Sequence, residues 1–363
     1  MAYKVIISGG GTGGHIYPGI AIAAEVMRRN ASNKVLFVGA LGRMEMHKVP
    51  AAGFEIKGLP IVGLQRNLSL KNLLLPFKLL KSLWLARGII KNYRPNIVVG
   101  VGGYASAPTL RVASSLGVTT LLQEQNSYAG IANKWLAKAA TKVCVAYPNM
   151  DAYFEASKIV LTGNPVRSSI VNASCTRDEA LLKLGLNEAK KTLLIVGGSL
   201  GARSINNAIA SIFDQIINDD IQVIWQTGNQ YYDRIIKTIT PHKMAIVKEF
   251  IVDMHVAYAA ADVVISRAGA LSISELCIAG KPIILVPSPN VAEDHQTKNA
   301  QALVDANAAL MLKDDTLNTT LKPLLYKLLR DESLQLQLST NIKKLAIDNA
   351  AARIVNEIEA CIL

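Results

Sequence analysis

Short apolar runs rich in Val and Ile alternate along the chain with segments long enough to form helices. Runs that are hydrophobic throughout, with no polar face, are typical of parallel strands covered by helices on both sides. They predict strands at residues 3–8, 34–38, 97–101, 118–122, 142–145 and 158–161, and at 192–197, 221–226, 244–248, 262–266, 282–286 and 308–312. The pattern therefore predicts an α/β protein built on doubly wound sheets.

The two halves of the sequence begin alike. KVIISGGGTGGH and KTLLIVGGSLGAR each run from a predicted strand through glycines into a helix-length segment. A length of 363 residues agrees with two domains, and the turn formers Gly163, Asn164 and Pro165 mark a boundary. We expect two Rossmann-like domains, residues 1–163 and 164–344, facing each other across a cleft at the carboxyl ends of their strands, where open parallel sheets bind ligands.

The basic residues are unevenly distributed. Lys and Arg exceed Asp and Glu by 39 to 27, a net charge of +12, and residues 1–163 hold 19 basic against 6 acidic side chains. Residues 164–363 hold 20 against 21. The first half is thus suited to an anionic partner, which could be an acidic lipid surface, a phosphorylated ligand or nucleic acid. No stacking platform or recognition motif accompanies the charge, so we do not expect nucleic acid.

The sequence shows no sign of secretion or of a membrane span. Residues 5–24 are uncharged, but Pro18 and five glycines between Gly9 and Gly14 interrupt them. The apolar run before those glycines is too short for a secretory signal. No paired spacing of a disulfide framework or zinc site is found among the four cysteines, Cys144, Cys175, Cys277 and Cys361. We expect a cytosolic protein.

The first glycine run fits a dinucleotide motif only in part. Gly9, Gly11 and Gly14 satisfy GxGxxG after a strand. A NAD site also needs an acidic residue after the second strand, where this chain has Gly39 to Leu41. Arg43 leaves an NADP oxidoreductase as one alternative. A P-loop kinase or ATPase is not expected, because GxxxxGK[ST] is absent.

The candidate for acid–base chemistry is His15, which directly follows the glycines. An imidazole titrates near neutral pH and could take a proton from an attacking hydroxyl. The alternative is a histidine that only caps the helix or contacts phosphate. The sequence has no HExxH, HxxxH or DxD motif, so we expect metal-free catalysis without a cofactor.

Two further loops of the first half follow strands and should lie at the same sheet edge. VGGYASAP contains Tyr104, and LLQEQNSYAG contains Glu124 and Asn126. These polar groups suit a second substrate, although ordinary loop hydrogen bonds would explain each of them equally well. Glu124 is an alternative base, but a carboxylate usually needs desolvation to act near neutral pH.

The segment DVVISRAGALSISELCIAG reads as a strand, a turn of small residues and a helix. We expect Glu275 in the first helical turn, where it could accept hydrogen bonds from two ribose hydroxyls. Alternatively, Ser272 and Glu275 form a capping box. The glycines around Ser199 and the helix start after Gly269 offer backbone N–H groups to a diphosphate, or serve only tight turns.

Seven motifs together resemble the glycosyltransferases of family 28 that act in bacterial peptidoglycan synthesis. They are GGTGGHIYPGIAIA, GVGGYASAP, EQNSYAGIANKWLA, TGNPVR, GGSLGARSIN, SRAGALSISE and HQTKNA. The resemblance covers nearly the whole chain. It implies the two-domain GT-B fold and UDP-N-acetylglucosamine (UDP-GlcNAc) as the donor. It also implies an inverting, metal-independent transfer to the 4-hydroxyl of the N-acetylmuramyl unit of lipid I, which gives lipid II.

The resemblance also implies roles for individual residues. Glu275 should hold the uridine ribose, Ile251 should contact uracil through its backbone, Arg167 should lie near the diphosphate, and Gln296 should reach the sugar hydroxyls, although EDHQ departs from the family around it. The diphosphate and sugar should also meet Ser199, Ala270, Leu271, Ser272, Ile273, Ser274 and Glu275. The reaction side of the first domain should contain Thr12, Gly13, Gly14, His15 and Asn126. A last helix, within residues 345–363, should return to the first domain.

A basic, apolar segment at residues 64–95 is the candidate membrane surface. Leu73, Phe77, Leu80 and Trp84 are spaced as one helical face, in a segment with seven basic and no acidic residues. A second set, Leu74, Leu75, Leu79 and Leu83, could fill the core and leave the first set outside. We expect peripheral binding to anionic phospholipid at the cytoplasmic face of the membrane, although core packing would explain the same stripe. A soluble glycosyltransferase or sugar epimerase of the same fold would not need this surface.

Overall fold

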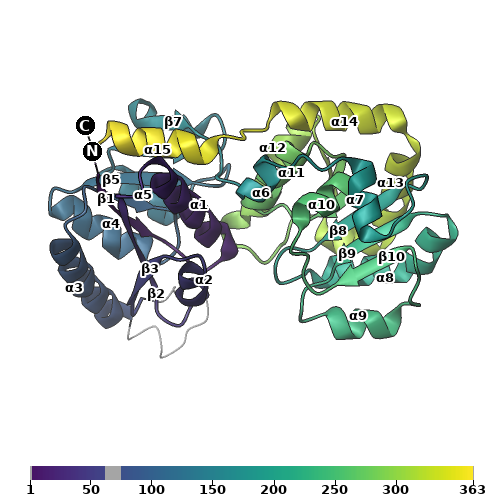
Figure 1. Ribbon diagram of the computed structural model, residues 1–363, viewed down its shortest axis with the longest axis horizontal. Coiled ribbons are helices and arrows are strands. Elements are labelled where there is room, and N and C mark those ends of the chain that lie inside the picture. Colours follow the sequence, from purple (N-terminus) through teal and green to yellow (C-terminus); the bar gives the residue numbers. More distant parts are fainter. Residues whose placement is uncertain (1, 62–74, 363) are drawn as a thin grey trace. The chain divides into compact units, whose positions relative to one another are not determined.

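The computed structural model describes residues 2–61 and 75–362 and divides into two compact units (Figure 1). Unit 1 comprises Met1–Arg167 together with Asp348–Leu363, and unit 2 comprises Ser168–Ile347. Each unit is a parallel sheet with helices packed on it, as the alternation of apolar runs and helical segments predicts.

Unit 1 contains a seven-stranded parallel sheet in the order β3-β2-β1-β4-β5-β6-β7. Its strands are β1 (Lys4–Ser8), β2 (Lys34–Ala40), β3 (Glu55–Leu59), β4 (Ile97–Gly100), β5 (Thr119–Glu124), β6 (Lys142–Val145) and β7 (Ile159–Leu161). Its helices are α1 (Gly13–Arg29), α2 (Glu45–Ala51), α3 (Leu75–Tyr93), α4 (Ser106–Ser115), α5 (Ile131–Ala137) and α15 (Ala350–Ala360), with 3-10 turns η2 (Met150–Ala152) and η3 (Ala156–Lys158).

The strands of unit 1 are buried on both faces, which explains their continuous apolar sequences. Ile6 and Val98 point to one side, into a core shared with α3, α4 and α5. Ile7 and Val99 point to the other side, into a core shared with α1 and α15. Because β1, β4 and β5 are neighbours and parallel, the loops after them lie at one edge of the sheet.

Unit 2 contains a six-stranded parallel sheet in the order β10-β9-β8-β11-β12-β13. Its strands are β8 (Thr192–Val196), β9 (Gln222–Gln226), β10 (Ala245–Lys248), β11 (Val263–Ser266), β12 (Ile283–Leu285) and β13 (Leu310–Met311). Its helices are α6 (Ser168–Val171), α7 (Arg177–Leu184), α8 (Arg203–Asn218), α9 (Tyr232–Thr238), α10 (Met254–Ala260), α11 (Ala270–Ala279), α12 (His295–Asp305), α13 (Leu317–Arg330) and α14 (Glu332–Lys344), with η4 (Ala292–Asp294) and η5 (Asp314–Thr316). Helices α8 and α13 share one core with the sheet.

The unit boundaries differ slightly from those expected. Unit 1 continues to Arg167 rather than ending at residue 163, because the Asn164 side chain is bonded within unit 1 to the Gln123 side chain and the Gln125 carbonyl. The chain rejoins unit 1 at Asp348 rather than 345, since Leu345 still bonds to the last turn of α14. Helix α15 then packs on α1, where Arg29 pairs with Glu359 at 2.6 Å.

Every predicted strand overlaps an observed one, but β3 was not predicted. It is the edge strand beside β2, and its first four residues alternate between exposed and partly buried positions before the buried Leu59. Glu55 and Lys57 form an ion pair on the exposed side. A half-exposed edge strand lacks the continuous apolar run that marks the buried strands, which explains the omission.

None of the helices in the described residues is both long enough and apolar enough to cross a membrane.

Candidate functional site

The predicted residues of unit 1 gather at the carboxyl ends of β1, β4 and β5. The glycine loop after β1 is bonded to its neighbours through Gly9 N–H to the Val38 carbonyl and Gly10 N–H to the Gly102 carbonyl, both at 3.2 Å. Thr12 is the N-cap residue of α1, and Gly13 and Gly14 form the start of that helix. Tyr104, from the loop after β4, is exposed and lies beside Gly11.

His15 is held with a defined orientation of its ring. Nδ1 lies 3.2 Å from the Gly10 carbonyl oxygen and 3.2 Å from Thr12 Oγ1. A carbonyl oxygen can only accept, so the bond to Gly10 requires the proton on Nδ1. Nε2 is then the nitrogen that can take up a proton. It lies against Gly102, where any Cβ would overlap the ring, which explains a glycine at that position.

Glu124 is buried, and its hydrogen bonds weigh against its role as the base. Oε1 accepts from both the backbone and the side-chain N–H of Asn126, each at 3.1 Å. Oε2 accepts from Gly130 N–H at 3.2 Å and from the Asn133 amide at 2.8 Å. Since both oxygens organise the loop after β5, this carboxylate is suited to shaping the site, and Asn126 is oriented by it.

Sequence reasoning missed Glu45 in this half of the site. Its side chain is only 1% exposed, and it accepts hydrogen bonds from Gly11 N–H at 2.8 Å and Ala40 N–H at 3.0 Å. No acidic residue directly follows the second strand, and Glu45 comes several residues later, at the start of α2. A search for an acidic side chain that could accept from the N–H groups of the glycine loop would have found Glu45. The search for a ribose-binding acid directly after the second strand did not.

Unit 2 assembles a second group of residues at the carboxyl ends of β8, β9, β11 and β12. Ser199 is exposed in the glycine loop after β8, while Gly201 packs so closely on the Thr227 carbonyl that no side chain could replace it. Gln226, at the end of β9, was also missed: it donates to the Gly198 carbonyl at 2.9 Å and accepts from Ile251 N–H at 2.8 Å. A uracil contact through the Ile251 backbone would therefore use its carbonyl.

The expected position of Glu275 was wrong. Helix α11 begins at Ala270 with Gly269 as its N-cap, so Ser272 is the third helical residue and Glu275 lies in the second turn. The predicted capping box is therefore absent. Glu275 is buried, and Oε2 accepts a hydrogen bond from the Tyr258 hydroxyl at 3.2 Å. Its carboxylate is thus oriented by α10 and does not cap α11.

Three residues at the start of α11 can offer backbone N–H groups to a ligand. Ile273 faces the core, and its N–H donates to the Gly269 carbonyl at 2.9 Å. The first N–H groups of a helix have no carbonyl partner in a preceding turn, so Ala270, Leu271 and Ser272 are the residues that offer them. Ser274 Oγ lies 3.1 Å from the Ala270 carbonyl.

Arg267 connects several segments at this sheet edge through hydrogen bonds. Its guanidinium donates to the Val286 and Pro287 carbonyls, each at 3.1 Å, to Ser204 Oγ at 2.8 Å and to the Asp314 carboxylate. At the start of α12, Gln296 Oε1 accepts from Ser288 N–H, in the loop after β12, at 2.9 Å. Arg167 is partly buried at the end of unit 1.

The sulfur and metal chemistry of the described residues is limited. All four cysteines are free thiols, and burial raises the pKa of Cys277, on α11, to about 12. Such a thiol stays protonated near neutral pH and is a poor nucleophile. No group of three or more His, Cys, Asp or Glu side chains in the described part of the chain could hold a metal ion.

Helix α3 carries most of the predicted membrane surface. Phe77, Leu80 and Trp84 are 71%, 64% and 73% exposed, while Leu73 lies outside the described residues. The core side of α3 is formed by Ser82, Ala86 and Ile90. The expectation that Leu79 fills the core was wrong, since it is 43% exposed, whereas Leu83 does pack on the core. Leu74 is outside the described residues.

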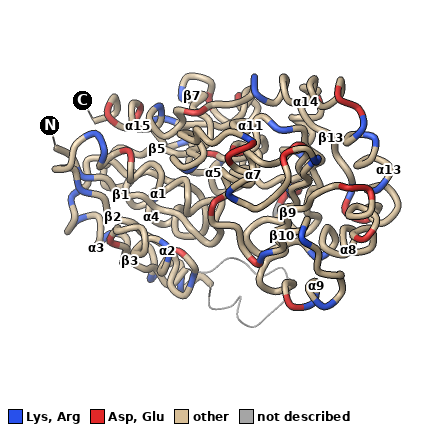
Figure 2. The backbone as a smooth tube through the Cα atoms, turned by 45° about the vertical axis from the view of Figure 1, so that its right-hand side comes forward, with Lys and Arg blue, Asp and Glu red and all other residues tan. Residues whose placement is uncertain are grey.

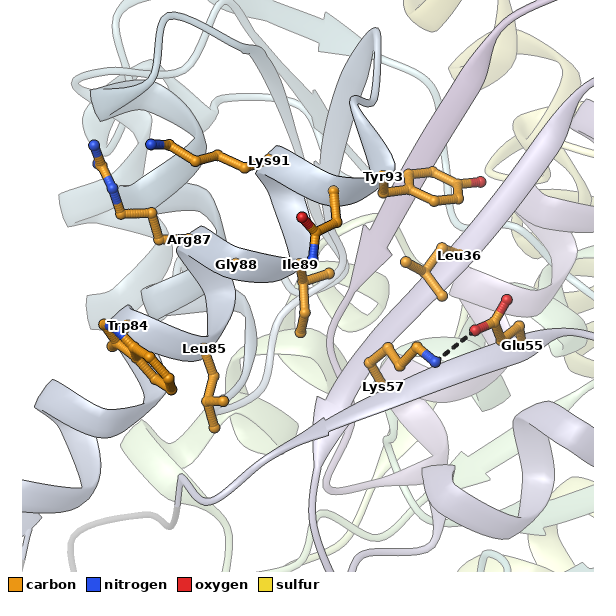
Figure 3. A pocket seen from close by; sticks show the side chains of 11 residues that line it. Leu36, Glu55, Lys57, Trp84, Leu85, Arg87, Gly88, Ile89, Lys91 and Tyr93 are labelled. Atoms are coloured by element: carbon orange, nitrogen blue, oxygen red, sulfur yellow. Dashed lines mark ion pairs between the residues drawn. The ribbon is translucent and has the colours of Figure 1, made fainter.

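A surface pocket of about 680 Å³ lies between α3 and the strands β2 and β3 (Figure 3). Trp84, Arg87 and Lys91 border it from α3, and the ion pair of Lys57 and Glu55 borders it from β3. Burial and the nearby Glu55 carboxylate raise the pKa of Tyr93, also in its lining, to about 12. The pocket contains none of the predicted substrate-binding residues, so it belongs with the α3 surface.

Two Rossmann-like units, with a histidine at one sheet edge and a glycine loop beside a helix N-terminus at the other, fit a nucleotide-sugar glycosyltransferase of the GT-B fold. The family models agree: the glycosyltransferase family 28 N-terminal domain matches residues 5–145, and the family 28 C-terminal domain matches residues 192–355. The chain belongs to glycosyltransferase family 28.

Individual relatives extend over almost the full length. A protein of Flavobacterium psychrophilum is 52% identical over 98% of this chain and 97% of its own, and one of Parabacteroides distasonis is 54% identical over the same shares. Both are named UDP-N-acetylglucosamine–N-acetylmuramyl-(pentapeptide) pyrophosphoryl-undecaprenol N-acetylglucosamine transferase. The crystal structure of Acinetobacter baumannii MurG is similar with a TM-score of 0.78 and 28% identity, covering 99% of each chain. Family membership supports the glycosyltransferase over the oxidoreductase and epimerase alternatives.

Proposed function

We propose that this protein transfers N-acetylglucosamine from UDP-GlcNAc to the 4-hydroxyl of the N-acetylmuramyl unit of lipid I, with inversion, to form lipid II. The observation that carries the proposal is the similarity, above 50% identity and over nearly the full length, to relatives named for this transfer. The orientation of His15 and the arrangement of α11 supply chemistry that fits it.

Unit 2 would bind the donor. Glu275, fixed by Tyr258, would accept hydrogen bonds from the ribose hydroxyls, and the Ile251 carbonyl would face uracil. The N–H groups at the start of α11 and the loop around Ser199 would meet the diphosphate, with Arg167 as a cationic neighbour. Gln296, held by Ser288, would contact the sugar hydroxyls.

Unit 1 would supply the base. The acceptor oxygen attacks the anomeric carbon, the bond from that carbon to the diphosphate oxygen breaks, and UDP leaves with the electron pair. The proton of the attacking hydroxyl passes to Nε2 of His15, whose Nδ1 already donates to the Gly10 carbonyl. Thr12, Gly13, Gly14, Tyr104 and Asn126 would surround the acceptor.

We further propose that no metal or cofactor takes part and that the protein binds peripherally to the cytoplasmic face of the membrane through α3. Phe77, Leu80 and Trp84 would enter the interface, with Lys81, Arg87 and Lys91 facing anionic headgroups. A membrane-anchored acceptor needs such contact, because the enzyme must reach a sugar that stays at the bilayer surface.

The test of the transfer reaction uses a lipid I analogue and UDP-GlcNAc with excess EDTA. The expected result is undiminished activity and a β-linked disaccharide by NMR. An α-linked product would exclude single displacement, and loss of activity in EDTA that added Mg²⁺ restores would exclude metal-free transfer.

A further inference from the structure

The glycine loop of unit 1 encloses a buried carboxylate that no step of the proposed reaction uses. Glu45 is the first residue of α2, and its side chain is 1% exposed. One carboxylate oxygen accepts from Gly11 N–H at 2.8 Å, and the other accepts from Ala40 N–H at 3.0 Å. Both oxygens are therefore bound to backbone N–H groups, as the oxygens of a bound phosphate would be.

The loop is shaped around this side chain. Gly10 and Gly11 have φ values of +140° and +87°, which favour glycine. A Cβ at Gly10 would overlap the Glu45 carboxylate, and a Cβ at Gly39 would overlap its side chain. The concavity that a phosphate would occupy in a nucleotide-binding loop is thus filled by the chain's own anion.

A single peptide group connects Glu45 to His15. The Gly11 N–H that donates to Glu45 and the Gly10 carbonyl that accepts from His15 Nδ1 belong to the same peptide plane. Binding at the N–H fixes the orientation of that plane and therefore of its carbonyl. Hydrogen bonds in such a chain polarise one another, so a carboxylate on the N–H strengthens the carbonyl as an acceptor.

We propose that Glu45 is a positioning residue for the transfer reaction, which acts through the Gly10–Gly11 peptide to hold His15 with its proton on Nδ1. This inference rests on the proposed role of His15 as the base. It also assigns the Gly11 N–H to an internal carboxylate, so this N–H group is not available to the acceptor diphosphate.

Glu45→Gln is the decisive substitution, because it keeps the shape of the side chain and removes the charge. The amide oxygen can accept from one N–H group, but the amide nitrogen then faces the other donor. We expect kcat to fall about 100-fold, as small displacements of a catalytic group can cause. UDP affinity, a property of unit 2, should stay within about twofold of the wild type because the sites are independent.

A double-mutant cycle separates positioning from a general structural role. Glu45→Gln is measured alone and in a His15→Ala background. If Glu45 acts through His15, the second substitution should lower the residual kcat by less than about twofold. An equal loss in both backgrounds, or a wild-type kcat for Glu45→Gln alone, would overturn the inference.

A second variant covers the case in which Glu45→Gln does not fold. Glu45→Ala leaves room for a small anion beside the Gly11 and Ala40 N–H groups. Sodium formate should raise its kcat in a saturable way, whereas sodium chloride at equal ionic strength should not. Formate without effect on a folded Glu45→Ala protein would contradict the inference.

Control measurements distinguish failure of this inference from failure of the base assignment and from failure of the proposed function. Glu155→Gln changes an exposed carboxylate of unit 1, paired with Lys158, and should leave kcat, UDP affinity and the response to formate unchanged. If His15→Ala alone keeps the wild-type kcat, the assignment of the base fails. If the wild type transfers no sugar to lipid I, the proposed function fails instead.

Discussion

The glycine loops of the two units follow the first strand of each sheet alike, but different groups hold them in place. In unit 1 the loop after β1 is supported by an anion, since Glu45 accepts from the Gly11 N–H group. In unit 2 the loop after β8 is supported by a donor, since the Gln226 amide donates to the Gly198 carbonyl. The Gly11 N–H group, which already binds a carboxylate, is not available to a phosphate, whereas a loop held by its carbonyl can direct its N–H groups at a ligand.

The two units also differ in the charge of their surfaces. Unit 2 mixes acidic and basic residues along its elements, as around α8, α9 and α13 in Figure 2. The described part of α3 in unit 1 contains Lys78, Lys81, Arg87 and Lys91 and no acidic residue. This difference agrees with the proposed division, in which the base and the lipid surface belong to unit 1 and the donor nucleotide to unit 2. The following substitutions test that division.

His15→Ala should have the largest effect. Loss of a general base typically costs about 100- to 10,000-fold in rate, so kcat should fall by that factor. UDP affinity, measured by calorimetry, should be nearly unchanged because the nucleotide is assigned to unit 2. If the variant kept most of its kcat, the base would be water or Glu124. The latter would be unexpected, because both oxygens of the Glu124 carboxylate already accept hydrogen bonds.

The double variant Phe77→Ser, Trp84→Ser should lose membrane binding. Each exposed aromatic side chain that enters an apolar phase contributes at least about 1.5 kcal/mol, so binding to anionic vesicles should weaken by roughly 100-fold. Wild-type binding should also weaken sharply with salt. UDP affinity and the melting temperature should not change.

The matched control is Leu182→Ser, Leu336→Ser, which alters two exposed leucines of unit 2. It should bind vesicles like the wild type. Equal losses for both double variants, or unfolding of the α3 variant, would show that α3 is not the docking surface.

Glu275→Ala should lower UDP affinity, which His15→Ala should leave nearly unchanged. Hydrogen bonds to a charged group contribute about 1.5 to 3 kcal/mol, and UDP affinity should fall by that amount. Tyr258→Phe is the control, because it removes the hydroxyl that holds Glu275 without removing the carboxylate. It should lower UDP affinity much less. If Glu275→Ala lowers the melting temperature and leaves UDP affinity intact, the carboxylate has only a structural role.

Thr176→Ala should have the smallest effect and should change neither catalysis nor UDP binding. Thr176 and Glu179 form a reciprocal capping box at the start of α7 in unit 2. Loss of an N-cap side chain typically costs about 1 kcal/mol of stability. Denaturant unfolding should show that loss, with kcat and UDP affinity unchanged. A change in UDP affinity would show that the donor site depends on α7.

Local sequence pattern was sufficient to predict a large part of this fold. Continuous apolar runs predicted the buried strands, because a strand covered on both faces needs hydrophobic residues throughout. The glycines after β1 and β8 predicted loops at the sheet edges. The seven motifs predicted membership of glycosyltransferase family 28. The polar edge strand β3 was missed, since half of it faces water.

Hydrogen bonds between groups far apart in the sequence could not be predicted and became visible in the folded chain. Glu45 and Gln226 lie far in sequence from the loops they support, and neither belongs to a motif that reveals its partner. The start of α11 at Ala270 moved Glu275 out of the first turn, because Gly269 rather than Ser272 adopts the N-cap conformation. Periodicity cannot detect such contacts, since a single hydrogen bond between distant residues leaves no repeat in the sequence.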